Sequence, residues 1–199
     1  MMKRLLAALV AALAFALAGC ATPPTAPGQA VVEGPPNHWT GRFSATVTGS
    51  GEGAREERSS GRFSLRVDGP RTQIELSSPM GQTIAQVTLD GGQATLLASD
   101  GKSWQAPSAE ALTEQVFGWR VPLGNLPDWL EGRIGEPTER DGDRVVAGRE
   151  HGWFIRIDSR DGDRPRRVAL DWPAQAGDGE RRLSLRLAID SALRIVARP

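Results

Sequence analysis

Hydrophobic and polar residues alternate with a period of two along most of the chain after Trp39. Such alternation is typical of a strand with one buried and one exposed face. The segments with the clearest alternation are 43–48, 63–68, 73–76, 86–89, 153–157, 168–172 and 183–189. Shorter strand patterns occupy 94–98, 144–147 and 193–196. Because no stretch alternates strands with helices, as a parallel sheet requires, the pattern predicts a mainly β fold with an antiparallel sheet.

Tight turns are predicted between several of these strands. Asp-Gly dipeptides, which favour two-residue hairpins, occur at 90–91, 100–101, 141–142 and 161–162. The glycine-rich and charged run 49–60 follows the first strand and is predicted to be a solvent-exposed hairpin loop.

A helical insert interrupts the strand pattern. Residues 108–118 begin with Ser108, a capping residue, and end with Gly118, while Leu112 and Val116 lie one helical turn apart. A second short helix is predicted over 126–130. The insert is rich in Leu, Phe and Trp, so we expect its apolar side to cover the concave face of the sheet.

The amino terminus has the pattern of a secretory signal peptide. Two basic residues precede an uninterrupted apolar stretch, Leu5 to Leu17, which is too short to span a bilayer. We predict that residues 1–19 form a cleaved signal peptide. Residues 20–38 are predicted to be a Pro- and Gly-rich flexible linker, and residues 39–199 a single folded domain.

The sequence Leu17-Ala18-Gly19-Cys20 resembles the lipobox of bacterial lipoproteins. That resemblance implies a covalent diacylglycerol and an N-acyl chain at Cys20. Ala21 stands where an Asp would resemble the signal for retention in the inner membrane, so the resemblance implies an anchor in the outer membrane, facing the periplasm. The alternative interpretation is an ordinary signal peptide followed by an incidental cysteine.

Composition argues against several other function classes. The chain has 24 basic and 24 acidic residues, whereas a nucleic-acid-binding protein usually has a basic surplus or patch. Its one cysteine and two histidines, His38 and His151, leave few ligands for a metal site. Hydrolase, zinc-protease and phosphate-loop motifs are absent from the sequence. We therefore predict no enzymatic activity, no catalytic residues, no metal and no cofactor other than the lipid at Cys20.

Several short motifs between residues 39 and 132 occur in the order and spacing of one known family. They are Trp39-Thr-Gly-Arg42-Phe43, Ser60-Gly-Arg62-Phe63-Ser64, Ile74-Glu-Leu76-Ser-Ser-Pro79-Met80-Gly81, Ser108-Ala-Glu110-Ala-Leu112 and Val121-Pro-Leu123, with Leu126, Trp129, Leu130 and Gly132. Together they resemble the family of the outer-membrane lipoprotein receptor LolB. Residues after 140 match it only as strands, and Leu65 stands where an aromatic residue is expected.

The resemblance implies an unclosed, half β-barrel of about 11 strands, with short helices covering its concave hydrophobic side. It also implies a receptor that accepts acylated lipoproteins from the soluble periplasmic carrier LolA and inserts them into the inner leaflet of the outer membrane. The expected partners are therefore LolA, the lipoprotein cargo and outer-membrane phospholipid, and we expect the receptor to be a monomer. Nucleic acid is not expected as a partner.

The apolar residues that alternate along the predicted strands, together with apolar residues of the insert, are expected to line an acyl-chain cavity. They are Phe43, Phe63, Leu65, Ile74, Leu76, Val87, Leu89, Trp104, Leu112, Val116, Phe117, Trp119, Leu126, Trp129, Leu130, Trp153 and Ile155. Pro79-Met80-Gly81 is a turn sequence, which predicts that Met80 lies at a loop tip. In the family, the matching apolar residue is implicated in delivering lipid to the membrane, so we expect residues 79–81 to form a membrane-delivery loop.

Two other functions fit part of the same sequence. A structural or accessory lipoprotein of an outer-membrane assembly complex would share the lipobox, the linker and the β-rich domain, but would need no acyl-chain cavity. A hydrolase acting on envelope lipid or glycan would require His38 or His151 in an active site.

Overall fold

The computed structural model describes residues 29–49, 56–172 and 182–197 of the chain. Within it, Val31–Ile195 form one compact unit, while Met1–Ala30 and Val196–Pro199 are grouped separately. The following description concerns the first unit. The predicted signal peptide, Cys20 and the tip of the first hairpin lie outside the described residues.

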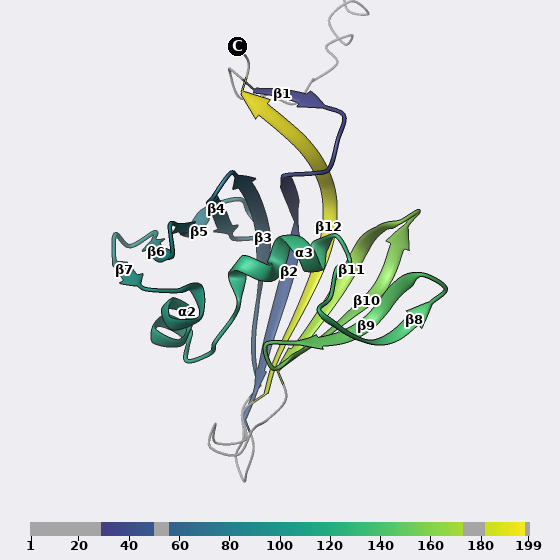
Figure 1. The fold of residues 1–199 in the computed structure, drawn as a ribbon. Coiled ribbons are helices and arrows are strands. Elements are labelled where there is room, and N and C mark those ends of the chain that lie inside the picture. The colour runs from purple at the N-terminus through teal and green to yellow at the C-terminus, as the bar shows by residue number, and fades with distance from the viewer. Residues whose placement is uncertain (1–28, 50–55, 173–181, 198–199) are drawn as a thin grey trace, which may run out of the picture. The chain divides into compact units, whose positions relative to one another are not determined.

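The described strands form one antiparallel sheet (Figure 1). They are β1 (Gln29–Val32), β2 (His38–Thr48), β3 (Glu56–Asp68), β4 (Arg71–Ser77), β5 (Thr83–Asp90), β6 (Gln93–Ala98), β7 (Ser103–Ala106), β8 (Glu136–Asp141), β9 (Arg144–Glu150), β10 (Trp153–Asp161), β11 (Arg164–Trp172) and β12 (Arg182–Ala197). The spatial order is β7-β6-β5-β4-β3-β2-β12-β11-β10-β9-β8, and β1 pairs with β12 outside this path. Because β7 and β8 stand at the two ends of this order and do not pair with each other, the sheet is unclosed, which confirms the predicted fold class.

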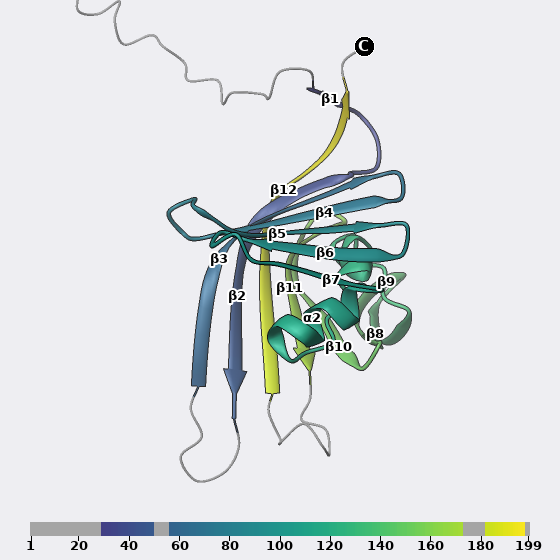
Figure 2. The ribbon, with the colours of Figure 1, turned by 90° about the vertical axis from the view of Figure 1, so that its left-hand side faces the viewer.

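The helical insert connects β7 to β8 and consists of α2 (Ala109–Phe117), the short 3-10 helix η1 (Leu123–Asn125) and α3 (Leu126–Leu130). It lies across the concave side of the curved sheet (Figures 1 and 2). Both predicted helices are confirmed. The Ser108 hydroxyl accepts a 3.1 Å hydrogen bond from the Ala111 N–H, and Gly118 ends α2 in the left-handed conformation.

The hydrophobic core lies between the insert and the concave face. Buried residues of the insert, such as Leu112 and Trp129, belong to one cluster with buried strand residues such as Leu65, Val87 and Ile155. The predicted alternation is correct, because these strand residues occupy every second position while their neighbours are more exposed. Among the helices within the described part, none has the length and apolar character needed to cross a membrane.

Five strands differ from the sequence-based expectation. β7 and β8 were not predicted, and all six residues of β8 are exposed, so that strand lacks an alternating pattern. β3 begins at Glu56, inside the expected loop, and β1 lies within the segment expected to be a linker. β12 is one strand with an irregularity between Ile189 and Ser191, where two strands were expected. Backbone pairing with β9 creates β8 without a hydrophobic pattern.

Two glycine–phenylalanine pairs explain the first two family-like motifs. Gly41 lies opposite Phe63 and Phe43 lies opposite Gly61 on the paired strands β2 and β3. An added Cβ at Gly41 would be 2.7 Å from Phe63 Cε1, and one at Gly61 would be 2.9 Å from Phe43 Cε1. Each aromatic ring therefore covers the glycine of the opposite strand, a pairing that leaves no room for a side chain.

Candidate functional site

The predicted cavity residues gather on the concave side of the sheet and on the facing side of the insert. All of them except Phe117 belong to the hydrophobic cluster or pack against it. Several are fully enclosed, and Leu112, Trp129, Trp153 and Ile155 have no exposed surface. At these four positions the space between the concave face and the insert is filled by side chains.

Phe117 differs from the other predicted cavity residues. It is the last residue of α2, and its side chain is 49% exposed. Conversely, the hydrophobic cluster includes residues that the predicted set lacks, among them Trp39, Leu96, Val168 and Leu170. The same period-two alternation that selected the other strand residues would have found Leu96 and Leu170.

Three tryptophan indoles fasten the insert to the sheet. Trp129 on α3 donates from Nε1 to the Glu150 carboxylate at the end of β9, over 2.9 Å. Trp153 on β10 donates to the Arg120 carbonyl at 3.1 Å, and Trp39 on β2 donates to Glu131 Oε1 at 3.3 Å. Because buried indole N–H groups need an acceptor, these bonds satisfy the rings and position the insert.

Glu150 is the main polar contact of α3. Besides the Trp129 indole, its carboxylate accepts 2.9 Å hydrogen bonds from Asn125 Nδ2 and from the Gly135 N–H. Its side chain is 19% exposed. These bonds join residues before, within and after α3 to one strand, so Glu150 holds the insert in its covering position. Sequence analysis did not identify Glu150, because its partners come from distant parts of the chain.

A buried threonine stabilises the first half of the insert. Thr113 on α2 is 1% exposed, and its hydroxyl accepts a 2.9 Å hydrogen bond from the Val121 N–H. The hydroxyl can donate to the Glu110 or Val121 carbonyl. α2 is therefore fixed to the segment that leads into η1 and α3.

Met80 projects from the β4–β5 loop, where the turn sequence predicted it. The loop is closed by backbone hydrogen bonds from Gly81 N to Ser78 O and from Ser78 N to Gln82 O. Gly81 has a φ of +87°, a conformation that favours glycine. The Met80 side chain is 91% exposed. The Met80 side chain is therefore accessible to another molecule or surface.

The two histidines lie in different settings. His38 Nε2 is hydrogen-bonded to Ser64 Oγ at 2.9 Å, while its buried Nδ1 has no partner among the described residues. The pKa of His38 is lowered by burial and, to a smaller extent, by Arg66. A hydrolytic triad needs an acid at Nδ1 to orient the imidazole. Among the described residues, no acid is bonded to Nδ1 of His38. His151 lies exposed in the β9–β10 turn, with a positive φ of 48°.

A cavity of about 580 Å³ lies between the end of α3 and the β8–β9 hairpin. Most of its lining residues are charged. It is therefore unlike the apolar hollow that sequence analysis placed under the insert.

Known proteins resemble this chain over most of its length. The family model described as outer membrane lipoprotein LolB matches residues 38–191. The chain belongs to the LolB family.

Individual members of the LolB family agree with this assignment. The outer-membrane lipoprotein LolB of Chromobacterium violaceum is 38% identical over 168 residues, covering 81% of this chain and 89% of that protein. The LolB of Bordetella petrii is 36% identical over 189 residues, covering 91% of this chain and 90% of that protein.

A solved structure of a LolA superfamily protein from Nitrosomonas europaea aligns with a TM-score of 0.43 and 9% identity, over 84% of this chain and 89% of that one.

Membership of the LolB family identifies the chain as an outer-membrane lipoprotein, as the lipobox and Ala21 indicated. It also places the chain in a family of lipoprotein-localisation factors. The family match begins at His38, where β2 begins, and it includes the whole insert together with the Met80 loop.

Proposed function

We propose that this LolB-family chain receives acylated lipoproteins from the periplasmic carrier LolA and inserts them into the inner leaflet of the outer membrane. The observation that carries this proposal is the apolar concave face, which is covered by an insert held through a few hydrogen bonds. The lipid anchor at Cys20, after removal of residues 1–19, and the flexible linker that follows would keep the domain at the membrane.

The acyl chains of the cargo would occupy space between the insert and the concave face. Because that space is filled in this structure, uptake requires the insert to move outward. Breaking the hydrogen bonds of Glu150 releases α3 from the sheet, and the chains then replace the contacts that Trp129 and Leu130 lose. Each acyl CH₂ removed from water contributes about 0.8 kcal/mol, so a fatty chain can offset such a loss.

Transfer in one direction needs only graded affinities, with no nucleotide and no covalent step. A preference of about 1.4 kcal/mol for the receptor over the carrier gives a tenfold bias toward the receptor. The bilayer must bind the acyl chains more strongly still, so that the cargo leaves. The exposed Met80 is suited to contact the bilayer first, because its loop carries no charged side chain between Ser78 and Gln82.

The decisive experiment follows a lipoprotein between two soluble proteins. Residues 21–199, which include every described residue, are mixed with LolA that carries a radiolabelled lipoprotein, and the two proteins are then separated by affinity tag. Movement of the label onto residues 21–199 supports the proposal, and retention of the label on LolA contradicts it. Unacylated cargo is the control and must not move.

The close packing of the concave face also suits a second function. Residues such as Leu65, Leu112 and Ile155 are at most 1% exposed, as expected for a structural or accessory lipoprotein that has no acyl-chain cavity. Such a protein would leave the label on LolA and would show no binding of a fluorescent fatty acid. The same two measurements therefore separate the scaffold from the receptor.

A further inference from the structure

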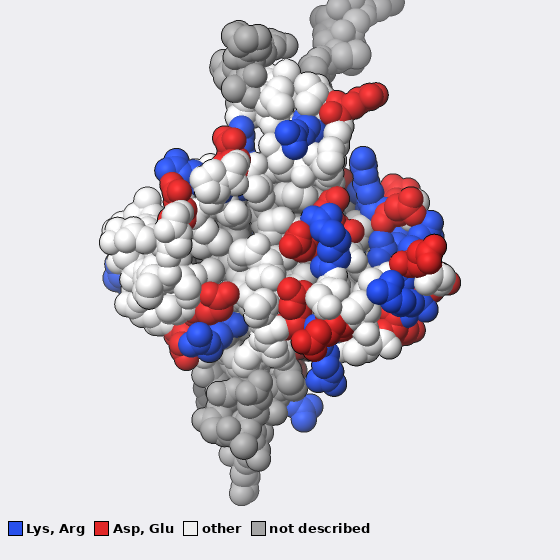
Figure 3. Space-filling model, viewed as in Figure 1, with Lys and Arg blue, Asp and Glu red and all other residues white. Residues whose placement is uncertain are grey.

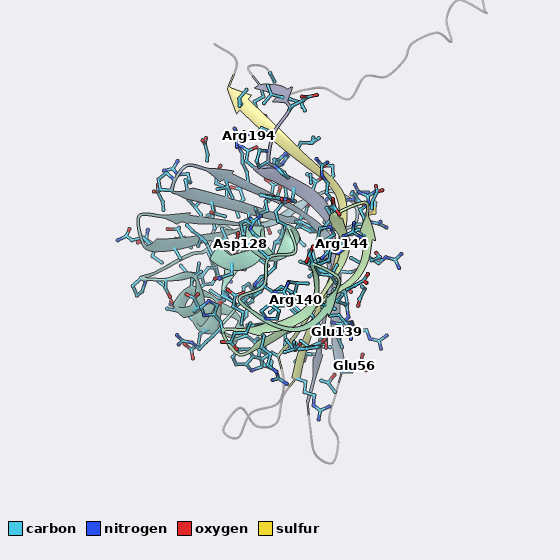
Figure 4. The ribbon with its side chains drawn as sticks, turned by 45° about the vertical axis from the view of Figure 1, so that its right-hand side comes forward. Glu56, Asp128, Glu139, Arg140, Arg144 and Arg194 are labelled. Atoms are coloured by element: carbon cyan, nitrogen blue, oxygen red, sulfur yellow. The ribbon has the colours of Figure 1, made fainter. Side chains whose placement is uncertain are left out.

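The charged cavity differs from the rest of the surface. Figure 3 shows acidic and basic side chains interleaved over β8, β9 and β10, while the surface over β5, β6, β7 and α2 carries few charges. Figure 4 shows Asp128, Arg140 and Arg144 around the opening between α3 and the β8–β9 hairpin. The cavity of about 580 Å³ at this opening is large enough for a small organic group with its hydration water.

Some of the charges that line the cavity neutralise one another. Arg133 pairs with Asp128 at 2.7 Å, and Arg144 pairs with Asp163 at 2.5 Å. Arg140 and Arg160 are different, since neither has a carboxylate within 4 Å among the described residues. Both residues line the same cavity, whose lining also includes the carboxylates of Glu131, Asp143 and Glu150.

Backbone carbonyls hold these two guanidinium groups in place. Arg140 Nη1 donates to the Asp143 carbonyl at 3.3 Å. Arg160 donates from Nη1 to the Asp163 carbonyl at 2.6 Å and from Nη2 to the Val145 carbonyl at 2.8 Å. Burial, and then the nearby Arg144, lower the pKa of Arg160, while the nearby Asp163 partly opposes this shift. An anion between Arg140 and Arg160 would therefore relieve the cost of keeping Arg160 charged in a partly buried position.

The cavity also has an apolar part. Ile134 lines it and is only 7% exposed, as a member of the hydrophobic cluster. Val145 lines it as well and packs against that cluster. A ligand whose anionic group contacts the two guanidinium groups would thus place its remaining atoms over Ile134 and Val145. This arrangement suits an amphiphile more closely than a bare ion.

We propose that this cavity binds the phosphate of a phospholipid headgroup between Arg140 and Arg160. Guanidinium groups bind phosphate oxygens through charge-assisted hydrogen bonds, and two of them from different strands can contact one phosphate together. An outer-membrane lipoprotein always has phospholipid next to it. The proposal rests on that location and is independent of the acyl-chain transfer proposed above.

The test uses the full chain, purified in a neutral detergent and phosphate-free buffer, with binding measured by isothermal titration calorimetry. The probes are glycerophosphoethanolamine, which is a headgroup without acyl chains, inorganic phosphate, and glycerol as the uncharged control. The double variant Arg140→Gln/Arg160→Gln removes the two proposed contacts. The matched control, Arg62→Gln/Arg167→Gln, removes two exposed arginines that form no ion pair within the described parts of the chain.

We expect saturable binding of glycerophosphoethanolamine to the wild type and the control variant, and at least tenfold weaker binding to the cavity variant. Because Arg160 also bonds to backbone carbonyls, Arg140→Gln alone is measured too and must weaken binding with unchanged circular dichroism. If inorganic phosphate binds and glycerophosphoethanolamine does not, the lipid assignment is overturned. No saturable binding to the wild type, or equal weakening in both double variants, would overturn the site.

Discussion

The Trp129 indole and the Glu150 carboxylate are joined by a 2.9 Å hydrogen bond that connects α3 to the end of β9. The same carboxylate accepts hydrogen bonds from Asn125 and Gly135. One acidic side chain therefore makes three of the hydrogen bonds that hold the insert over the hydrophobic face, although it lies outside the apolar cluster itself.

Glu150→Gln should destabilise the fold by about 1–3 kcal/mol, because an amide can accept fewer of the three hydrogen bonds and leaves a buried donor unsatisfied. Urea unfolding measures this change in the free energy of unfolding. The variant should also take up acylated cargo faster, since its insert opens more easily. Glu136→Gln is the matched control: Glu136 is exposed on β8, so its replacement should alter neither quantity. Slower uptake by Glu150→Gln would argue against an insert that moves.

Gly41→Ala should be strongly destabilising, by about 3 kcal/mol or more, because overpacking forces backbone and ring to shift. The added Cβ would overlap the Ala188 carbonyl oxygen and contact the Phe63 ring. Thermal or urea unfolding tests this expectation.

Gly69→Ala provides the comparison for the Gly41 variant. Gly69 has a positive φ of 57°, but an added Cβ there meets no atom within 4 Å. Only the conformational cost remains, about 1 kcal/mol. If the two substitutions cost the same, the close glycine–phenylalanine contact would not explain the motif.

Met80→Glu should leave stability within about 0.5 kcal/mol of the wild type, because the side chain is 91% exposed. A charge at this position makes contact with the bilayer interior unfavourable, so delivery of cargo into liposomes should slow at least tenfold. Uptake from LolA should remain unchanged. Gln82→Glu adds the same charge to the same loop and serves as the control. Normal delivery by Met80→Glu would remove the proposed role of Met80.

Stability should decline as the pH falls below about 6.5, the usual pKa of histidine. Burial first, and then Arg66, lower the pKa of His38 in the folded state. In the pH interval between the usual value and this lower one, the unfolded chain binds a proton that the folded chain does not, and this favours unfolding. The contribution of neutral His38 is fully present above pH 6.5 and is lost as the pH falls through the folded-state value.

Urea unfolding at a series of pH values measures the His38 contribution. His38→Gln can keep a hydrogen bond to Ser64 but cannot titrate, so the decline should become shallower. His151→Gln changes an exposed histidine and should retain the wild-type decline. An unchanged decline in His38→Gln would mean that other groups cause it. Envelope-hydrolase activity that is present in the wild type and lost in either histidine variant would favour the hydrolase hypothesis over both non-enzymatic functions.

Short-range patterns were predicted well because their causes are local. Ser108 and Gly118 cap α2 through bonds to residues at most four positions away, and the glycines of all four Asp-Gly turns have positive φ values. Strand β8 was missed, since its exposed residues carry no periodic pattern and its only structural requirement is pairing with β9.

By itself, the sequence determined the strand-rich fold, the two helices, the exposed Met80 turn and the family. Strand alternation, helix capping and family motifs are patterns of residues that lie close together in the sequence. Only the tertiary structure decided that Glu150 secures the insert, that Phe117 points outward, and that Arg140 and Arg160 share a cavity. Each of these features depends on residues brought together from separate strands and loops. Their distance and burial follow from the curvature and order of the sheet, which no local pattern encodes.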